Sequence, residues 1–213
     1  MGLSGAGMNG IYQNQAFIEN LDFTNLKTIF ELGAGRGVDT VEVFNFFEPD
    51  ALYAFEADPV NHAKMVEYLK NFDLKGRVRG FNAAVCNRNG STDFWRHPDY
   101  RSSSIIKHPR DACEKITVNS ITLDAFCAQM KVPSIDIILA DIQGAEVLAF
   151  LNQRVMGTVQ YVITSAGRDP AWKPSYPLIG DLEAVLAPYG LKRKKEVVIH
   201  DGLAGHYLFE KGE

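Results

Sequence analysis

Three glycines at alternate positions form the part of this sequence best suited to chemistry. Gly33, Gly35 and Gly37 follow an apolar stretch that ends with Glu31 and Leu32, and apolar residues recur at helical spacing directly after them. This order predicts a buried strand, a tight turn and a helix, an arrangement in which backbone N–H groups reach a ligand. A side chain at Gly33 or Gly35 would hold that ligand away from the backbone.

An acidic residue lies where a nucleoside ligand would need one. Glu56 follows a second apolar run and lies nineteen residues beyond Gly37. An ionised carboxylate has only hydrogen-bond acceptors, so Glu56 suits the two hydroxyl groups of an unphosphorylated ribose. The same carboxylate would repel a ribose that carries a 2′-phosphate.

Two cofactors compete for this pattern, NAD and S-adenosylmethionine. The NAD fingerprint is G-x-G-x-x-G, with the pyrophosphate at the start of a helix, whereas the turn from Gly33 to Gly37 reads G-x-G-x-G. The carboxylate of Glu31 suits the ammonium and sulfonium groups of S-adenosylmethionine better than it suits a pyrophosphate. The sequence therefore favours S-adenosylmethionine, and an NAD-binding oxidoreductase stays open as an alternative.

Candidate catalytic residues follow a third apolar run or lie in a polar loop. Asp141 lies near the end of the apolar run Ile135–Ile142, and we expect it to act as a general base or to anchor the acceptor. His97 and His108 lie in the polar, basic segment 97–111, and either can titrate near neutral pH. Asp141 and His108 are the predicted catalytic residues. The end of the next strand offers no further carboxylate ligands, so no metal site is predicted.

Strands that alternate with helices must position these residues. Predicted strands cover Leu26–Ala34, Ala51–Ala57, Arg77–Val85, Ser91–Arg96, Ile116–Ile121, Ile135–Ile142, Val159–Thr164, Leu191–His200 and Gly205–Glu210. Predicted helices cover Ile11–Leu21, Val38–Phe47, a segment starting at Asp58-Pro59, Leu123–Met130, Gly144–Leu151, and a segment from Leu178 that Gly190 closes. This alternation predicts a doubly wound α/β sheet, mostly parallel, with an antiparallel hairpin at its edge. Ligands bind beyond the carboxyl ends of the strands in such a sheet.

The motifs at these strand ends resemble a known family. Glu31–Gly37 is similar to motif I of class I S-adenosylmethionine-dependent methyltransferases, and further stretches resemble the FkbM-type branch of that family. These stretches are Tyr53–Pro59, Asn82–Val85, Thr122–Phe126, Ile135–Glu146 and Tyr207–Phe209. The resemblance covers residues 26–211, and the run Asp141-x-x-Gly144-Ala145-Glu146 is its most specific part.

The resemblance implies a Rossmann-like, seven-stranded sheet with an antiparallel last strand, and methyl transfer to a hydroxyl on a sugar, a lipid or a small metabolite. It assigns Glu31, Gly33 and Gly35 to the methionine end of S-adenosylmethionine, Glu56 to the ribose, and Asn82–Ala84 to the adenine. The full set of predicted cofactor-binding residues is Glu31, Gly33, Ala34, Gly35, Gly37, Glu56, Ala57, Asn82, Ala83, Ala84, Asp141 and Ile142.

Several positions depart from the family pattern. The motif around Asp141 usually follows a lysine and contains another glutamate, where this chain has Leu139 and Gln143, and Ser165 replaces an acid near the end of the next strand. Cofactor contacts tolerate such changes better than catalytic contacts do. The departures leave a second function open, that of a diverged cofactor-binding protein with an interaction or regulatory role and little activity. For Glu146, in the helix after Asp141, we expect a structural role.

The composition is that of an ordinary globular protein. The chain has 213 residues, of which 46% are hydrophobic and 23% charged, and a net charge of −4. We expect one domain over residues 11–213, after a mobile tail of residues 1–10. The mild charge predicts no nucleic-acid partner, and no segment approaches the roughly 18 apolar residues of a membrane span. The three cysteines lack metal spacing, which fits reduced thiols in a cytoplasmic protein.

Overall fold

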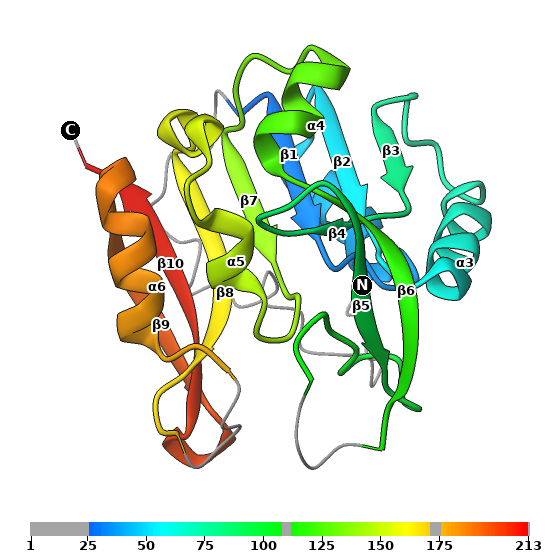
Figure 1. The fold of residues 1–213 in the computed structure, drawn as a ribbon. Helices are drawn as coiled ribbons and strands as arrows, with labels where there is room; N and C mark the ends of the chain where they lie inside the picture. Colours follow the sequence, from blue (N-terminus) through cyan, green and yellow to red (C-terminus); the bar gives the residue numbers. More distant parts are fainter. Residues whose placement is uncertain (1–25, 108–111, 171–175, 213) are drawn as a thin grey trace, which may run out of the picture.

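The protein has an α/β fold of three layers (Figure 1). A computed structural model describes residues 26–107, 112–170 and 176–212, so the predicted tail and the predicted helix Ile11–Leu21 lie outside the described residues. The strands are β1 (Thr28–Leu32), β2 (Ala51–Phe55), β3 (Val78–Phe81), β4 (Ala84–Val85), β5 (Gly90–Arg96), β6 (Glu114–Ile121), β7 (Ile137–Ala140), β8 (Tyr161–Gly167), β9 (Leu191–Ile199) and β10 (Ala204–Lys211). The helices are α2 (Val38–Phe47), α3 (Pro59–Leu69), α4 (Leu123–Met130), α5 (Glu146–Phe150) and α6 (Ile179–Leu186), with 3₁₀ turns η1 (Arg154–Thr158), η2 (Ala187–Tyr189) and η3 (His200–Gly202).

The main sheet has seven strands in the order β3-β2-β1-β7-β8-β10-β9. β10 runs antiparallel to both of its neighbours, and the pairs among the other central strands are parallel. The predicted fold class is therefore confirmed. The chain fills the sheet outward from β1 through β2 to β3 and then crosses to β7, so the strand order reverses between β1 and β7. Ligands bind at such a reversal, beyond the carboxyl ends of the strands.

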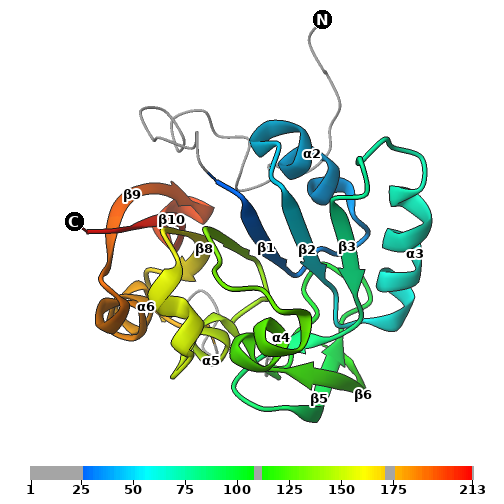
Figure 2. The same ribbon diagram turned by 90° about the horizontal axis from the view of Figure 1, so that it is seen from above.

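Helices cover both faces of the main sheet, with α2 and α3 on one face and α4, α5 and α6 on the other (Figure 2). Alternate residues of the central strands pack into the two resulting cores: Phe30 and Leu32 of β1 lie in the core with α4 and α5, whereas Ile29 lies in the core with α2. All four residues of β7 are buried. A strand covered on both faces reads as a continuous apolar run, which is how the sequence around β7 reads.

Local sequence signals set the starts of the two helices beside the predicted site. α2 covers the predicted range Val38–Phe47 and begins after Gly37, whose φ of 84° lies in the left-handed region that favours glycine. α3 begins at Pro59, and the side chain of Asp58 accepts a hydrogen bond from the N–H of Val60 at 2.8 Å. Both starts agree with the sequence-based predictions.

The predicted strand Arg77–Val85 is wrong as a single strand. The chain leaves the main sheet after β3, and β4 pairs in parallel with β6 in a second sheet of order β4-β6-β5. The break falls at Asn82, whose Nδ2 donates hydrogen bonds to the backbone oxygens of Glu56 at 2.9 Å and Ala57 at 3.0 Å. These bonds hold the bend that leads into the second sheet, which contains both of the predicted short strands as β5 and β6.

The apolar residues of α3 and of the turn that follows it are only partly buried. Met65 is fully buried, whereas Val66 is 39% exposed, and Phe72, just beyond the helix, is 38% exposed. The reason is that α3 lies at the end of the sheet, over β3, and packs against it with one narrow face.

The last two strands form the predicted antiparallel hairpin at the edge of the sheet. β9 is the edge strand, and its Arg193 and Lys194 pair with Glu183 at 3.1 Å and Glu210 at 2.9 Å. A charged edge of this kind hinders pairing with another sheet. Gly190 closes the 3₁₀ turn η2 rather than α6 itself, so the α-helical part ends earlier than the position of this glycine predicts.

Candidate active site

A cavity of about 580 Å³ opens beyond the carboxyl ends of β1, β2, β7 and β8. Small-molecule sites in proteins have volumes of roughly 300–1,000 Å³. The glycine turn, the end of β2, the segment 99–105 and the loop after β7 form most of its wall, and the start of β10 closes the far end. The cavity therefore lies at the reversal of strand order, where the sequence predicted a ligand.

The glycine turn touches the loop after β7. Gly33 has a φ of 89°, and the N–H groups of Gly33 and Ala34 both donate to the carbonyl oxygen of Phe55 at 2.9 Å. A Cβ at Gly33 would lie 2.2 Å from the backbone oxygen of Asp141, whereas a Cβ at Gly35 would meet no atom within 4 Å. Gly33 thus allows the two loops to approach, and Gly35 leaves space for a ligand.

Glu56 joins the glycine turn to the end of β2. Its two carboxylate oxygens accept hydrogen bonds from the N–H groups of Gly35 at 2.8 Å and Asp58 at 2.7 Å. Burial raises the pKa of Glu56 to about 7, and the N–H donors of Asp58 and Gly35 oppose this rise. Since each carboxylate oxygen has a second lone pair, Glu56 can also accept hydrogen bonds from a ligand in the cavity that it lines.

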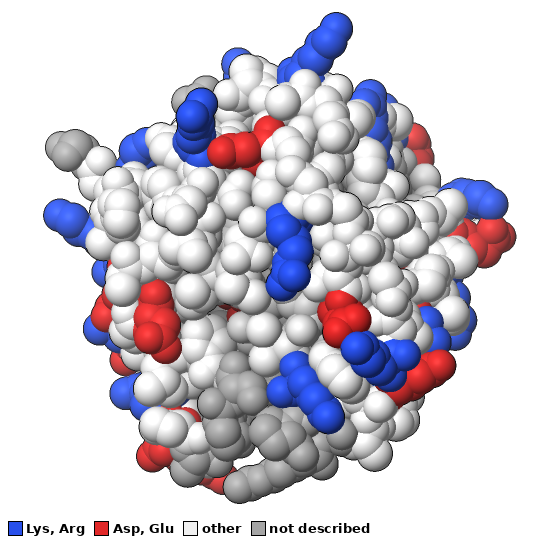
Figure 3. Space-filling model, in the orientation of Figure 1, with Lys and Arg blue, Asp and Glu red and all other residues white. Residues whose placement is uncertain are grey.

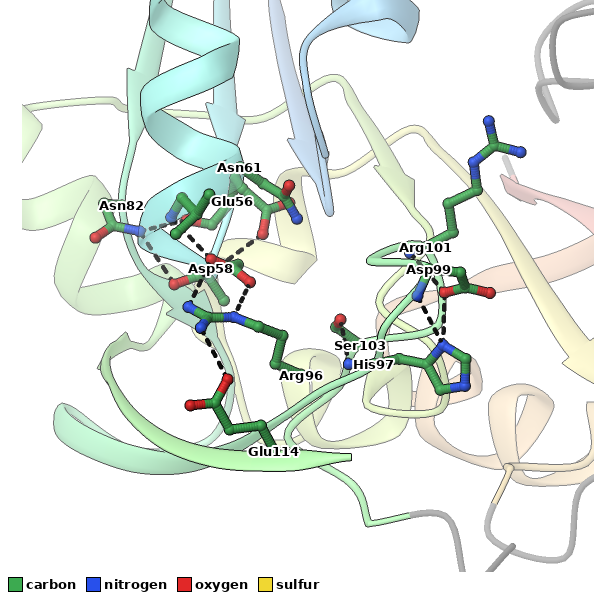
Figure 4. A network of polar contacts seen from close by, with 12 residues as sticks. Glu56, Asp58, Asn61, Asn82, Arg96, His97, Asp99, Arg101, Ser103 and Glu114 are labelled. Atoms are coloured by element: carbon green, nitrogen blue, oxygen red, sulfur yellow. Dashed lines mark hydrogen bonds and ion pairs between the residues drawn. The ribbon is translucent and has the colours of Figure 1, made fainter. Parts of the chain in front are cut away.

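An ion-pair network holds the end of β2 against the second sheet (Figure 4). Arg96 of β5 donates to Asp58 through Nε at 2.6 Å and Nη2 at 3.0 Å, and to Glu114 through Nη1 at 3.1 Å. Asp58 is only 2% exposed. Two bonds from one guanidinium to one carboxylate fix geometry as well as contributing energy. The segment that follows β5 is therefore held in place relative to Glu56.

That segment covers one side of the cavity. The side chain of His97 pairs through Nδ1 with the carboxylate of Asp99 at 2.7 Å, and the backbone N–H of His97 donates to Oγ of Ser103 at 2.9 Å (Figure 4). The guanidinium of Arg36 lies 3.6 Å from the centroid of the Tyr100 ring. This cation–π contact joins the covering segment to the glycine turn, and the three successive serines of the segment line the cavity.

Glu146 holds the loop after β7 from inside the protein. Its carboxylate oxygens accept hydrogen bonds from the N–H groups of Ile142 at 3.0 Å and Gly144 at 2.9 Å, and its side chain is fully buried. Burial raises the pKa of Glu146 to about 8, and these N–H donors oppose the rise. The predicted structural role of Glu146 is confirmed by these bonds.

Asp141 lines the cavity as part of a network of side chains. Its Oδ1 accepts a hydrogen bond from Nε2 of Gln143, and Oε1 of Gln143 accepts one from the hydroxyl of Tyr176. The hydroxyl of Ser104 donates to the backbone oxygen of Ile142 at 3.1 Å. The network therefore connects the loop after β7 both to the covering segment and to the residues beyond β8.

Nine of the twelve predicted cofactor-binding residues line the cavity: Gly33, Ala34, Gly35, Glu56, Ala57, Ala83, Ala84, Asp141 and Ile142. Gly37, Asn82 and Glu31 are not part of its wall. A Cβ at Gly37 would lie 2.9 Å from Cγ of Met65, so Gly37 allows α3 to pack closely, and Asn82 holds the bend after β3. The predicted catalytic residue Asp141 is in the wall, and His108 lies outside the described residues.

Glu31 lies beneath the cavity rather than in its wall. It is 2% exposed, and its Oε2 has no hydrogen-bond partner. Burial raises the pKa of Glu31 to about 8, the side chain of Thr40 opposes this rise, and the carboxylates of Asp39 and Glu56 add to it. A buried carboxylate with one unsatisfied oxygen is costly, and a cationic ligand in the cavity would stabilise its ionised form. The position of Glu31 therefore suits a positively charged ligand without requiring direct contact.

Residues at the far end of the cavity were missed by sequence reasoning. His206 of β10, His200 of η3 and Tyr176 line this end, together with Ser165 of β8. His206 is the register partner of Ser165 in the antiparallel pair of β8 and β10. The predicted hairpin could have indicated these residues. An antiparallel last strand starts at the edge of the sheet where the parallel strands end, so its first residues lie beside the cavity.

The fold and this site define the class I fold of S-adenosylmethionine-dependent methyltransferases. The family described as methyltransferase FkbM domain matches residues 31–170, more than half of the chain, and the chain therefore belongs to this family. The resemblance inferred from the motifs is confirmed. The predicted cofactor is also confirmed, since the family uses S-adenosylmethionine.

The chain is similar to several characterised or solved proteins. It is 30% identical over 135 residues to the 2-O-methyltransferase NoeI of Sinorhizobium fredii (strain NBRC 101917 / NGR234), an alignment that covers 55% of this chain and 54% of the relative. The chain thus spans about half the length of this relative. A solved methyltransferase FkbM from Methylobacillus flagellatus KT has a TM-score of 0.59 at 13% identity, covering 89% of this chain and 45% of that one. Aeropyrum pernix fibrillarin, in complex with S-adenosylmethionine, has a TM-score of 0.53 at 14% identity. The match covers 89% of this chain and 68% of the fibrillarin chain. These structural similarities show the fold alone.

The cavity residues fit this cofactor. Gly35 leaves open space beside the turn, Glu56 offers acceptors to a ribose, and the Oε2 of Glu31, next to the wall residue Leu32, is buried without a hydrogen-bond partner. Within residues 26–107, 112–170 and 176–212, no group of three His, Cys, Asp or Glu side chains is arranged to hold a metal ion. None of the helices that the structure describes is long and apolar enough to cross a membrane.

Proposed function

We propose that this protein transfers a methyl group from S-adenosylmethionine to a hydroxyl oxygen of a sugar, a lipid or a small metabolite. The observation that carries the proposal is the cavity in which Glu56 and the glycine turn face Asp141. An oxygen acceptor is supported by the relative whose name is 2-O-methyltransferase. Bound S-adenosylmethionine would supply a methyl group activated by the positive charge on sulfur.

The residues of the chain would act by binding and positioning. Glu56 would accept hydrogen bonds from the ribose hydroxyls, and Gly33 and Gly35 would let the methionine end lie close to the backbone. The stacked pair of Arg36 and Tyr100 would exclude water from one side of the cavity. Holding two reactants in line supplies about 7–11 kcal/mol of such a barrier, so much of the rate would come from positioning.

The face of the molecule shown in Figure 3 favours a small-molecule or glycan acceptor over a nucleic acid. On the face shown in Figure 3, the Lys and Arg side chains of the described residues are interspersed with acidic ones and form no continuous basic patch. A nucleic-acid site needs basic side chains clustered on one face.

The buried thiols of Cys86 and Cys127 support a reducing compartment such as the cytoplasm.

Calorimetric titration with S-adenosylmethionine, S-adenosylhomocysteine and NAD tests the class of ligand. We expect both sulfur nucleotides to bind and NAD not to bind, because the turn lacks the G-x-G-x-x-G spacing of NAD sites and Glu31 disfavours a pyrophosphate. A radiolabelled methyl-transfer assay on methyl pyranosides, glycerol and fatty alcohols then tests the acceptor. NAD binding alone would identify an oxidoreductase. Cofactor binding without transfer to any hydroxyl would favour the diverged binding protein that the departures at Leu139, Gln143 and Ser165 suggest.

The affinity for the ribose is expected to depend on the ionisation of Glu56. Its pKa is raised to about 7, and ribose hydroxyls donate to the ionised form, so affinity should fall as the pH drops through 7. Adenosine carries the ribose without the ammonium or sulfonium group, so it isolates Glu56 from Glu31. We expect adenosine to bind roughly eightfold more weakly at about pH 6 than at about pH 7.5, in proportion to the ionised fraction.

Two neutral variants assign this pH dependence to one residue. Calorimetry on Glu56→Gln should show adenosine affinity that no longer changes between these pH values, whereas Glu31→Gln should keep the change. If the adenosine affinity of Glu56→Gln still changed with pH, Glu56 would not be the residue that binds the ribose.

A further inference from the structure

The cavity extends beyond the part that the cofactor residues define. Along the edge of the sheet, the wall passes from Glu56 after β2 to the glycine turn after β1, then to Asp141 after β7, Ser165 on β8 and His206 on β10. If the ribose lies at Glu56, the adenosine occupies the β2 end of this row. The end formed by β8 and β10 is then left for the methyl acceptor.

His206 lines this end of the cavity. Its Nδ1 is buried and has no hydrogen-bond partner, so Nε2 is the ring nitrogen that an acceptor in the cavity can reach. A hydroxyl group beside Nε2 would have a hydrogen-bonding partner there. The register partners of His206 are Ser165 of β8 and Val197 of β9, which are both neutral. Ser165, which stands near the position of an acid in the family pattern, therefore places no carboxylate opposite the imidazole.

The imidazole of His206 is neutral near pH 7. Burial lowers its pKa below the ordinary value for histidine, and the neighbouring His200 of η3 adds to this effect. A neutral imidazole has one nitrogen that accepts a proton. The carboxylates toward the other end of the cavity have other partners: Asp141 accepts a hydrogen bond from Gln143, and Glu56, at the ribose end, accepts two from the backbone.

We propose that His206 is a catalytic residue that binds the acceptor hydroxyl through Nε2 and acts as its general base. This role rests on the proposed function. The proton of the hydroxyl moves to Nε2 while its oxygen forms the new bond to the methyl carbon, and the electron pair of the broken S–CH₃ bond stays on sulfur. The products are a methyl ether, neutral S-adenosylhomocysteine and a His206 imidazolium, which returns its proton to solvent.

The variant His206→Asn tests this role, because asparagine keeps a polar side chain no larger than histidine but cannot act as a base. With S-adenosylmethionine at saturation and the best hydroxyl acceptor from the panel, we expect kcat to fall by about 10²–10⁴-fold. Affinity for S-adenosylhomocysteine, measured by calorimetry, should stay within about twofold of the wild-type value. The wild-type kcat should rise with pH and level off near the pKa of His206, and the variant should lack this inflection.

His62→Asn is a matched control. Nε2 of His62, on α3, is also buried without a hydrogen-bond partner, but His62 does not line the cavity. This variant should keep the wild-type kcat and pH profile, with circular dichroism melts showing that both variants fold. If His206→Asn fails to fold, His206→Gln replaces it with the same expected loss.

The outcomes separate this role from the proposed function. A His206→Asn or His206→Gln variant with wild-type kcat and pH profile overturns the role of His206 and leaves methyl transfer standing. If the wild-type protein transfers no methyl group to any hydroxyl, the proposed function and the role of His206 both fall.

Discussion

Gly33→Ala is expected to destabilise the folded protein by about 2–6 kcal/mol. The glycine has a φ of 89°, a conformation that costs a residue with a side chain about 1–3 kcal/mol. The new Cβ would also lie 2.2 Å from the backbone oxygen of Asp141, which cannot rotate away as a side chain can. Forcing such a contact typically costs a further 1–3 kcal/mol or so. Urea unfolding, followed by circular dichroism, measures the loss.

The same substitution should weaken cofactor binding, because Gly33 and Asp141 both line the cavity and must move apart. We expect the affinity for S-adenosylhomocysteine to fall about tenfold or more, which corresponds to about 1.4 kcal/mol. Gly76→Ala is the matched control, since Gly76 has a φ of 65° but no atom within 4 Å of an added Cβ. The Gly76→Ala variant should lose only the stability that the backbone strain costs, and it should bind S-adenosylhomocysteine with wild-type affinity. Equal losses of stability in the two variants would contradict the collision with Asp141.

The cofactor half of the site could be predicted because its residues directly follow buried strands. Gly33, Glu56 and Asp141 each come after an apolar run, and parallel strands bring their carboxyl ends to one edge. Glu31 shows the limit of this reasoning. Its type and position predicted a role toward a cation, but only the structure shows that it lies beneath the cavity with an unpaired oxygen.

The contacts that hold the cover of the cavity in place could not be predicted, because they join residues far apart in the chain. Arg36 stacks on Tyr100, and Ser104 bonds to the backbone after β7. These contacts exist because β5 and β6 form a second sheet together with β4. The sequence predicted one continuous strand from Arg77 to Val85, so β4 was not recognised as part of a separate sheet. The side chain of Asn82 interrupts that strand by donating two hydrogen bonds to backbone oxygens. The spacing of apolar residues in the sequence does not predict these bonds.

The departures from the family pattern have structural consequences in the far half of the site. Gln143, which stands where the family has a glutamate, donates to Asp141 and accepts from Tyr176. A glutamate carboxylate could not donate to Asp141 in this way. Ser165 is small and neutral opposite His206. The departures therefore leave the far end of the cavity with a neutral serine opposite His206 and with an amide, rather than a second carboxylate, bonded to Asp141.

Glu146→Ala is expected to cost about 2–6 kcal/mol of stability and to loosen the loop after β7. The carboxylate of Glu146 accepts hydrogen bonds from the N–H groups of Ile142 and Gly144, and its side chain is fully buried. Alanine would leave both N–H groups without an acceptor, and each buried, unsatisfied group costs about 1–3 kcal/mol. Urea unfolding measures the loss of stability, and hydrogen exchange of the Ile142 and Gly144 amides measures the local opening.

Two comparison variants separate this effect from a general response to losing a glutamate. Glu67 on α3 is exposed and pairs only with Lys70 at the surface, so Glu67→Ala should change stability by no more than about 0.5 kcal/mol. Glu146→Gln keeps one acceptor oxygen and should fall between the wild type and Glu146→Ala. If Glu146→Ala unfolds at the wild-type urea midpoint, the loop is held by other contacts. In that case Asp141 and Ile142 would owe their place in the cavity wall to the packing of β7 against β1, where Gly33 meets the backbone of Asp141.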